Sequence, residues 1–84
     1  MKNTYDLAQV CEICRVHEDL IFRFISYSWI KPAQENIFDR EDLARIRLIH
    51  QLQEHFGVND EAVSIVLNLV DQLNRIHREI KIAG

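Results

Sequence analysis

The sequence predicts an all-α fold that carries a minimal two-stranded wing and ends in a long helix. Apolar residues recur three and four positions apart through most of the 84 residues, which is the period of a helix buried on one face. A single proline, Pro32, interrupts this pattern and forces the residue before it into extended geometry. We expect one domain over residues 1–84, with a core in 1–58 and a long C-terminal helix in 59–84.

Two short helices are predicted before the proline. Thr4 is a candidate N-cap for a first helix over about 5–14, whose apolar face consists of Leu7, Val10, Cys11 and Cys14. A tight turn at 16–19 then opens a second helix over about 18–27, with His17 at the cap and two acids in the first turn. This second helix has little polar surface, since it contains Leu20, Ile21, Phe22, Phe24, Ile25 and Tyr27.

An extended segment and a third helix follow. We expect Trp29 and Ile30 to pair antiparallel with residues 37–38 across a turn at 33–36, forming the wing. Asp39 is predicted to cap the third helix, with Asp42 at its third position completing a capping box. Gly57 supplies the left-handed stop, and the expected core face is Leu43, Ile46, Ile49, Leu52 and Phe56. This order of elements is that of a winged helix-turn-helix.

The last helix, over about 60–82 after the cap Asn59, carries two apolar stripes. One is a heptad seam along its whole length, formed by Ala62, Val66, Leu69, Leu73, Ile76 and Ile80. The other occupies only the N-terminal half and consists of Val63, Leu67 and Val70. We therefore expect a homodimer joined through Val66, Leu69, Leu73, Ile76 and Ile80; the alternative is that the helix folds back and the seam completes the monomer's own core.

Composition and charge limit the possible functions. The net charge is −3, whereas affinity for nucleic acid comes from an excess of Lys and Arg, so the balance favours a protein partner with a basic face. No apolar run approaches the roughly 20 residues that span a bilayer. The N-terminus lacks the apolar region of a secretory signal, and the two cysteines then imply reduced thiols, so we expect a cytoplasmic protein.

No residue pattern points to catalysis. Cys11, Cys14 and His17 have spacings typical of a partial zinc site, but no further ligands follow, so we interpret the cysteines as small apolar residues and expect no metal or cofactor. The two glycines, Gly57 and Gly84, cannot form a glycine-rich phosphate loop. We expect that the protein is not an enzyme.

Five short motifs carry a family resemblance: Tyr5-Asp6-Leu7-Ala8, Val16, Ile30-Lys31-Pro32, Phe38-Asp39 and Asp42-Leu43-Ala44-Arg45-Ile46. In this order they resemble the MerR-type winged helix family over roughly 4–75. The short chain, the acidic and apolar second helix and the proline-ended arm look more like the CbpM family, small modulators of the J-domain co-chaperone CbpA. That resemblance implies a regulator that inhibits a CbpA-type co-chaperone by occupying its J-domain, on the surface used by Hsp70.

Two departures from MerR regulators weaken a DNA-binding interpretation. Phe22 stands where that family places an arginine early in the second helix, and Glu35-Asn36-Ile37 stands where its wing carries Gly-Tyr-Arg. Base readout and phosphate anchoring both need several cationic donors. A MerR-like transcriptional regulator that binds DNA as a dimer is thus the alternative hypothesis, and a structural adaptor is a third.

The candidate partner-binding residues combine aromatic anchors with acids, namely Phe22, Trp29, Glu35, Asp39, Glu41 and Asp42. Aromatic side chains dominate interface hot spots, and a compact negative patch complements a basic helix. Each has a structural alternative: Trp29 packs the arm onto the helices, and the acids at 39–42 stabilise a helix N-terminus.

Overall fold

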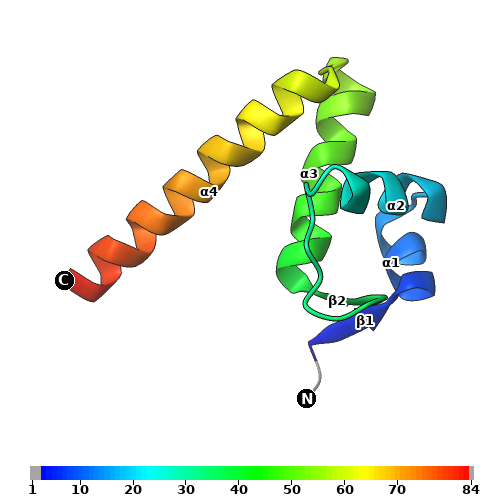
Figure 1. Ribbon diagram of the computed structural model, residues 1–84, viewed down its shortest axis with the longest axis horizontal. Coiled ribbons are helices and arrows are strands. Elements are labelled where there is room, and N and C mark those ends of the chain that lie inside the picture. Colours follow the sequence, from blue (N-terminus) through cyan, green and yellow to red (C-terminus); the bar gives the residue numbers. More distant parts are fainter. Residues whose placement is uncertain (1–2, 84) are drawn as a thin grey trace.

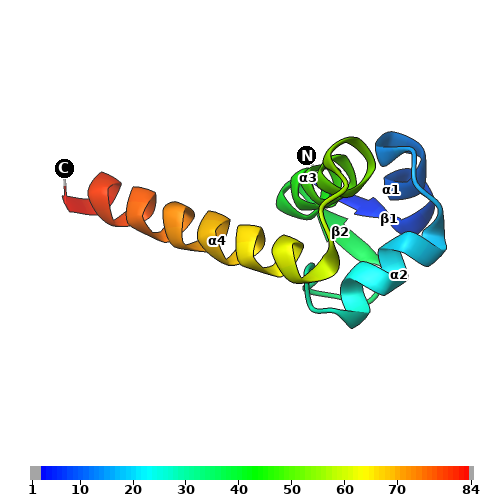
Figure 2. The same cartoon turned by 90° about the horizontal axis from the view of Figure 1, so that it is seen from above.

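The structure is a computed structural model that describes residues 3–83, and the side chains of 3–81. Four helices and a two-stranded antiparallel sheet follow one another as β1 (Thr4–Asp6), α1 (Leu7–Cys14), α2 (Glu18–Ser26), β2 (Ile37–Asp39), α3 (Arg40–Phe56) and α4 (Asp60–Ala83). The first three helices and the sheet form a body, and α4 leaves it at the α3–α4 corner (Figure 1). A second view shows the C-terminal half of α4 extending away from the body (Figure 2).

The sheet pairs other segments than the sequence predicted. β1 and β2 are antiparallel, with Tyr5 opposite Phe38, so the N-terminal segment is the partner of 37–39. The predicted pairing of Trp29 and Ile30 with 37–38 is wrong. Both residues of that consecutive pair are buried, whereas an exposed wing strand turns alternate side chains to solvent. They form an extended connector packed into the body.

Local hydrogen bonds explain where the first two helices begin. Asp6 caps α1, not Thr4 as predicted: its carboxylate accepts from the Gln9 amide at 2.8 Å, and the Gln9 side chain accepts from the Asp6 amide at 2.9 Å. Thr4 is not the cap because α1 begins at Leu7, so the residue immediately before the helix is Asp6. His17 caps α2 as predicted, with Nδ1 accepting from the Asp19 amide at 3.2 Å.

The predicted boundaries of the two long helices are confirmed. Asp39 and Asp42 form the reciprocal capping box of α3, with distances of 2.8 and 3.0 Å. Gly57 ends α3 in the left-handed region at φ 61°, where a side chain is strained. The Asn59 side chain then accepts from the Ala62 amide at 2.9 Å at the start of α4.

The core draws on every part of the body and on the first turns of α4. Its buried residues are Val10, Cys14, Ile21, Phe24, Trp29, Ile30, Phe38, Leu43, Ile46, Ile49, Val63 and Leu67. The prediction for the core face of α3 is confirmed for Leu43, Ile46 and Ile49, which are buried, and Leu52 is half-buried. Phe56 is 75% exposed, contrary to the prediction, because it lies at the corner where α3 ends beyond the rest of the body (Figure 1).

The two stripes of α4 have different environments. Val63 and Leu67 face the core and Val70 is half-buried, so the short stripe is the one that docks α4 onto the body. In the heptad seam Ala62 and Val66 are half-buried, while Leu69, Leu73, Ile76 and Ile80 are 50–65% exposed. The alternative in which the seam completes the monomer's core is therefore wrong for these four positions.

Candidate functional site

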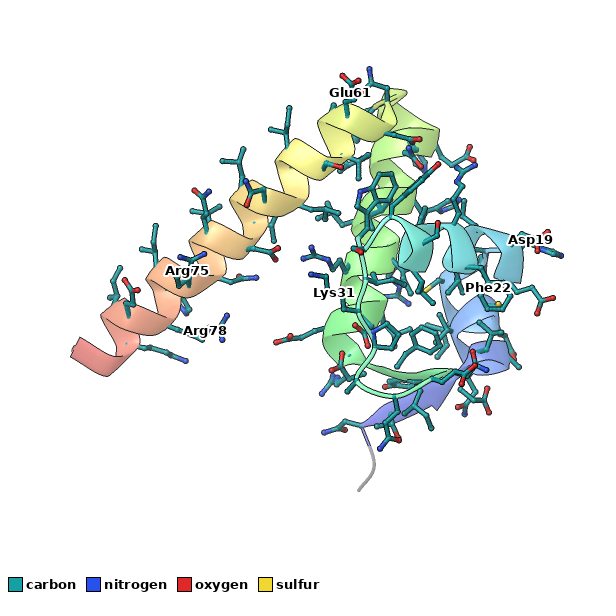
Figure 3. The ribbon with its side chains drawn as sticks, in the orientation of Figure 1. Asp19, Phe22, Lys31, Glu61, Arg75 and Arg78 are labelled. Atoms are coloured by element: carbon teal, nitrogen blue, oxygen red, sulfur yellow. The ribbon has the colours of Figure 1, made fainter. Side chains whose placement is uncertain are left out.

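Helix α2 presents a mixed acidic and apolar surface. Ile21 and Phe24 point into the core, and the opposite side of the helix is exposed. We call this exposed surface the outer face of α2; it consists of Glu18, Asp19, Phe22, Arg23 and Ser26. Phe22 is 44% exposed at its centre. Asp19 and Phe22 both lie on the side of the molecule remote from α4 (Figure 3).

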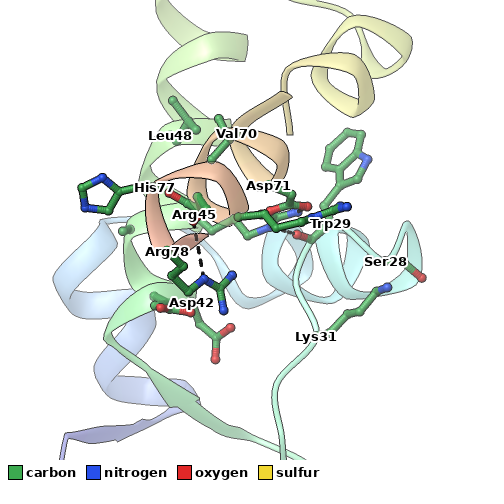
Figure 4. A pocket seen from close by; sticks show the side chains of 14 residues that line it. Ser28, Trp29, Lys31, Asp42, Arg45, Leu48, Val70, Asp71, His77 and Arg78 are labelled. Atoms are coloured by element: carbon green, nitrogen blue, oxygen red, sulfur yellow. Dashed lines mark hydrogen bonds and ion pairs between the residues drawn. The ribbon is translucent and has the colours of Figure 1, made fainter. Parts of the chain in front are cut away.

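A second candidate surface is a pocket of about 820 Å³ between α3, the 28–31 connector and α4. Its ionic side chains come from all three segments (Figure 4). The cations are Lys31, Arg45, Arg75 and Arg78, and the acids are Glu41, Asp42 and Asp71. The pocket is therefore lined by both signs of charge in similar number.

Arg45 joins the three segments of this pocket. Its two terminal nitrogens donate to the Asp71 carboxylate of α4 at 2.6 and 3.1 Å, a bidentate ion pair. Its Nε donates to the Trp29 carbonyl of the connector. The hydrogen bond from Arg45 lowers the pKa of Asp71, and the charges of Arg45, Lys31 and Arg75 act in the same direction while burial opposes them. Arg45 thus serves to position α4.

Trp29 occupies the interior and is not an exposed anchor. It is 5% exposed, and its ring lies 5.6 Å from that of Phe24 and 4.8 Å from that of Tyr27. Its indole N–H donates to the Ser64 hydroxyl at 3.0 Å, which ties α4 to the body. Trp29 therefore packs the connector onto the helices, the structural alternative considered for it.

Of the other five predicted partner-binding residues, only Glu41 and Asp42 share a surface with Trp29. Asp39 and Asp42 bind each other's backbone amides in the capping box, and burial raises the pKa of Asp42. Glu41 is exposed and lines the α3–α4 pocket together with Trp29 and Asp42. Phe22 and Glu35 are exposed outside that pocket, and partner binding by any of these residues stays a prediction.

The cysteines have the environment of packing residues. Cys14 is buried with its sulfur 4.0 Å from the Leu43 carbonyl oxygen, and Cys11 is half-buried. Burial raises the pKa of both thiols, in Cys14 against the opposing charge of Arg47. Among the described residues, no three His, Cys, Asp or Glu side chains come together as a metal site requires.

Sequence reasoning missed two features of these surfaces. The pair of Arg45 and Asp71 joins helices distant in sequence, and no local pattern signals it. Glu18 and Asp19 were recognised as acids of an acidic and apolar second helix that oppose DNA binding, but they were not combined with Phe22 into one surface, although their spacing from Phe22 already places them on one helical face. Acids placed three and four residues before an aromatic residue in a helix are the sequence signal for this surface.

The order of two short helices, a small sheet and a third capped helix defines a helix-turn-helix protein of the winged class. Residues 5–83 match the family described as MerR HTH family regulatory protein, and the chain belongs to that family. No functionally curated protein matches the chain. In residues 3–83 no helix has the length and apolarity that crossing a membrane demands.

Proposed function

We propose that the protein is a non-enzymatic modulator that binds and inhibits a CbpA-type J-domain co-chaperone. It does so by occupying the J-domain surface used by Hsp70. The family describes a regulator, and both a protein-binding and a DNA-binding regulator fit that description. The observation that carries the proposal is the acidic start of α2, where Glu18 and Asp19 are both exposed.

This acidic turn is unfavourable for DNA. A helix-turn-helix protein places the N-terminal residues of its second helix against base edges in the major groove. Carboxylates at these positions repel the phosphates on either side, and the chain as a whole has a net charge of −3. The partly buried Arg45 is engaged by Asp71 and so does not supply a phosphate contact. A basic protein surface is the better complement.

The proposed inhibition is a competition for one surface. J-domains carry a basic helix and a His-Pro-Asp loop that engage Hsp70. An acidic helix-turn-helix body covering the basic helix prevents Hsp70 from reaching it. Complementary charge accelerates the encounter and selects the partner, while apolar contacts supply most of the affinity.

The alternative function, a DNA-binding transcriptional regulator, is favoured by one observation. Arg15 and Arg23 line a groove of about 650 Å³ between α2 and α3, on the helix-turn-helix side of the body. Two arginines beside the second helix suit phosphate contacts. This alternative predicts a gel shift of the DNA upstream of the protein's own operon, weakened steeply by added salt.

Isothermal titration of the purified J-domain with the full chain tests the proposal. We expect saturable heat with the J-domain and no shift of the upstream DNA at the same protein concentration. Absence of heat at tens of micromolar protein ends the proposal. A salt-sensitive DNA shift without J-domain binding establishes the alternative.

We also propose that the protein acts as a homodimer joined through Val66, Leu69, Leu73, Ile76 and Ile80. The support is the exposure of the last four of these side chains, by half or more, on a helix that leaves the body. Every residue from Asp71 to Lys81 is exposed in the isolated chain. A heptad seam packs against another helix with the same repeat, so a second copy of α4 is the expected partner for these side chains.

A further inference from the structure

We propose that the outer face of α2 is the docking surface for a basic amphipathic helix of the partner, with Phe22 as the apolar anchor and Glu18 and Asp19 as the acidic flank. This inference rests on the proposed function and names the surface that performs it. It differs from the sequence prediction, in which the acids at 39–42 met the basic helix.

Phe22 is exposed without being needed to hold the helix in place. Ile21 and Phe24, both fully buried, attach α2 to the core from the other side. Phe22 also takes no part in the ring contacts that Trp29 makes with Phe24 and Tyr27. Nearly half of its surface is available to a partner, and a central aromatic that becomes buried is the usual hot spot of an interface.

The acids of α2 form no ion pair with a lysine or arginine among the described residues. The ion-pair partner of Asp19 is His17, whose Nδ1 lies 3.4 Å from the Asp19 carboxylate and which is charged only when protonated. Both side chains are at least 75% exposed. Glu18 forms no ion pair with another described residue. Arg23 is the one cation of the outer face, and it lines the α2–α3 groove together with Arg15 and Asp19, without an ion pair to Asp19.

The acids at 39–42 have partners of their own. Asp39 and Asp42 are committed to the capping box, and Glu41 lines the pocket that also holds Lys31 and two arginines of α4. The hydrogen bonds of the capping box hold the two aspartates in place. The outer face of α2 differs in combining exposed acids with an exposed phenylalanine, so it offers an external basic helix both a charge and an apolar contact.

These features select one kind of occupant. A basic amphipathic helix offers an apolar stripe for Phe22 and cations for Glu18 and Asp19, which is helix-on-helix recognition with matched charge. A DNA duplex meets repulsion from the same carboxylates. A second copy docked by the same face brings like charges together.

Four variants of the full chain, titrated with the purified CbpA-type J-domain, test the assignment. Phe22→Ala should weaken binding about 30-fold, the effect of a hot-spot truncation. Asp19→Lys should weaken binding about fivefold and reduce its salt dependence. The matched controls are Phe56→Ala, which truncates a more exposed phenylalanine at the α3–α4 corner, and Glu41→Lys, which reverses an exposed acid at the equivalent helix position of α3. Both controls should bind as the native chain does, and circular dichroism should show native helix content in all four.

Each outcome decides a different point. Native binding that persists in Phe22→Ala and Asp19→Lys overturns the α2 surface and leaves the proposed function standing. Loss of binding in Glu41→Lys, with Asp19→Lys unaffected, returns the interface to the start of α3. No binding of the J-domain by the native chain ends the proposed function and this assignment together. In the gel shift of the upstream DNA, weaker DNA binding by Phe22→Ala than by the native chain places DNA on this face instead.

Discussion

Replacing Leu73 with glutamate is expected to convert a homodimer into a folded monomer. Leu73 is 65% exposed in the isolated chain and is flanked along the seam by Leu69 and Ile76, exposed by about half. Complete burial of a leucine contributes about 1.5–3 kcal/mol, so covering the exposed part of Leu73 contributes about 1–2 kcal/mol. The side chain occurs once in each protomer, so its loss removes about 2–4 kcal/mol, a factor of about 30 to 1,000 in the dimer dissociation constant.

Sedimentation equilibrium over a series of protein concentrations measures this change. The native chain should sediment as a dimer and Leu73→Glu as a monomer with unchanged helix content, since the residue contributes nothing to the monomer's core. Gln72→Glu is the matched control: it introduces the same charge at an exposed neighbour outside the seam and should remain dimeric. A native chain that is monomeric at high micromolar concentration contradicts the seam, as does a Leu73→Glu dimer of native affinity.

Three further outcomes are expected. Because Arg45 lowers the pKa of Asp71 in the folded chain, the ion pair stabilises the fold above the ordinary pKa of 3.8 and this stabilisation is lost as the pH falls through the lowered value. Asp71→Asn should therefore lower the free energy of unfolding, measured by urea denaturation at neutral pH, by less than about 1 kcal/mol for a partly exposed pair, and this effect should shrink as the pH falls below 3.8; an effect that does not change with pH contradicts the linkage. Cys11→Ala combined with Cys14→Ser should leave J-domain binding intact and lower the free energy of unfolding by about 1–3 kcal/mol, because a hydroxyl replaces a buried thiol; stoichiometric zinc in the native protein by elemental analysis contradicts the packing role. Asp39→Ala should lower the free energy of unfolding by about 1 kcal/mol in thermal denaturation through loss of the cap, and an unchanged melting temperature argues against the capping box.

Features that depend on neighbouring residues could be predicted from the sequence. The start of α3 is fixed by Asp39 and Asp42, three positions apart, and its end by Gly57, where the backbone is left-handed. Both are local devices that a sequence displays directly. The same local reasoning failed at Thr4, because pairing of β1 with the distant β2 keeps residues 4–6 extended and moves the start of α1 to Leu7, which makes Asp6 the cap.

Features that depend on distant contacts could not be predicted. Pro32 fixes the geometry of the residue before it, yet it does not determine whether the connector pairs with a strand or packs into the core. Periodicity places two apolar stripes on α4 but does not determine which stripe faces the body. The stripe of Val63 and Leu67 faces it, because the short turn after Gly57 sets the orientation in which the helix starts. The candidate site is affected in the same way, since the pair of Arg45 and Asp71 exists only once the angle between α3 and α4 is set.

Inhibition of the co-chaperone's stimulation of Hsp70 tests the central claim most directly. The ATPase rate of Hsp70 in the presence of a CbpA-type co-chaperone is measured while the native chain is added, with Phe22→Ala added in parallel. The stimulated rate should fall to the unstimulated rate of Hsp70 as the chain saturates the J-domain, and excess Hsp70 should restore it because the two compete for one surface. A stimulated rate that is unchanged at saturating concentrations of the native chain contradicts the claim.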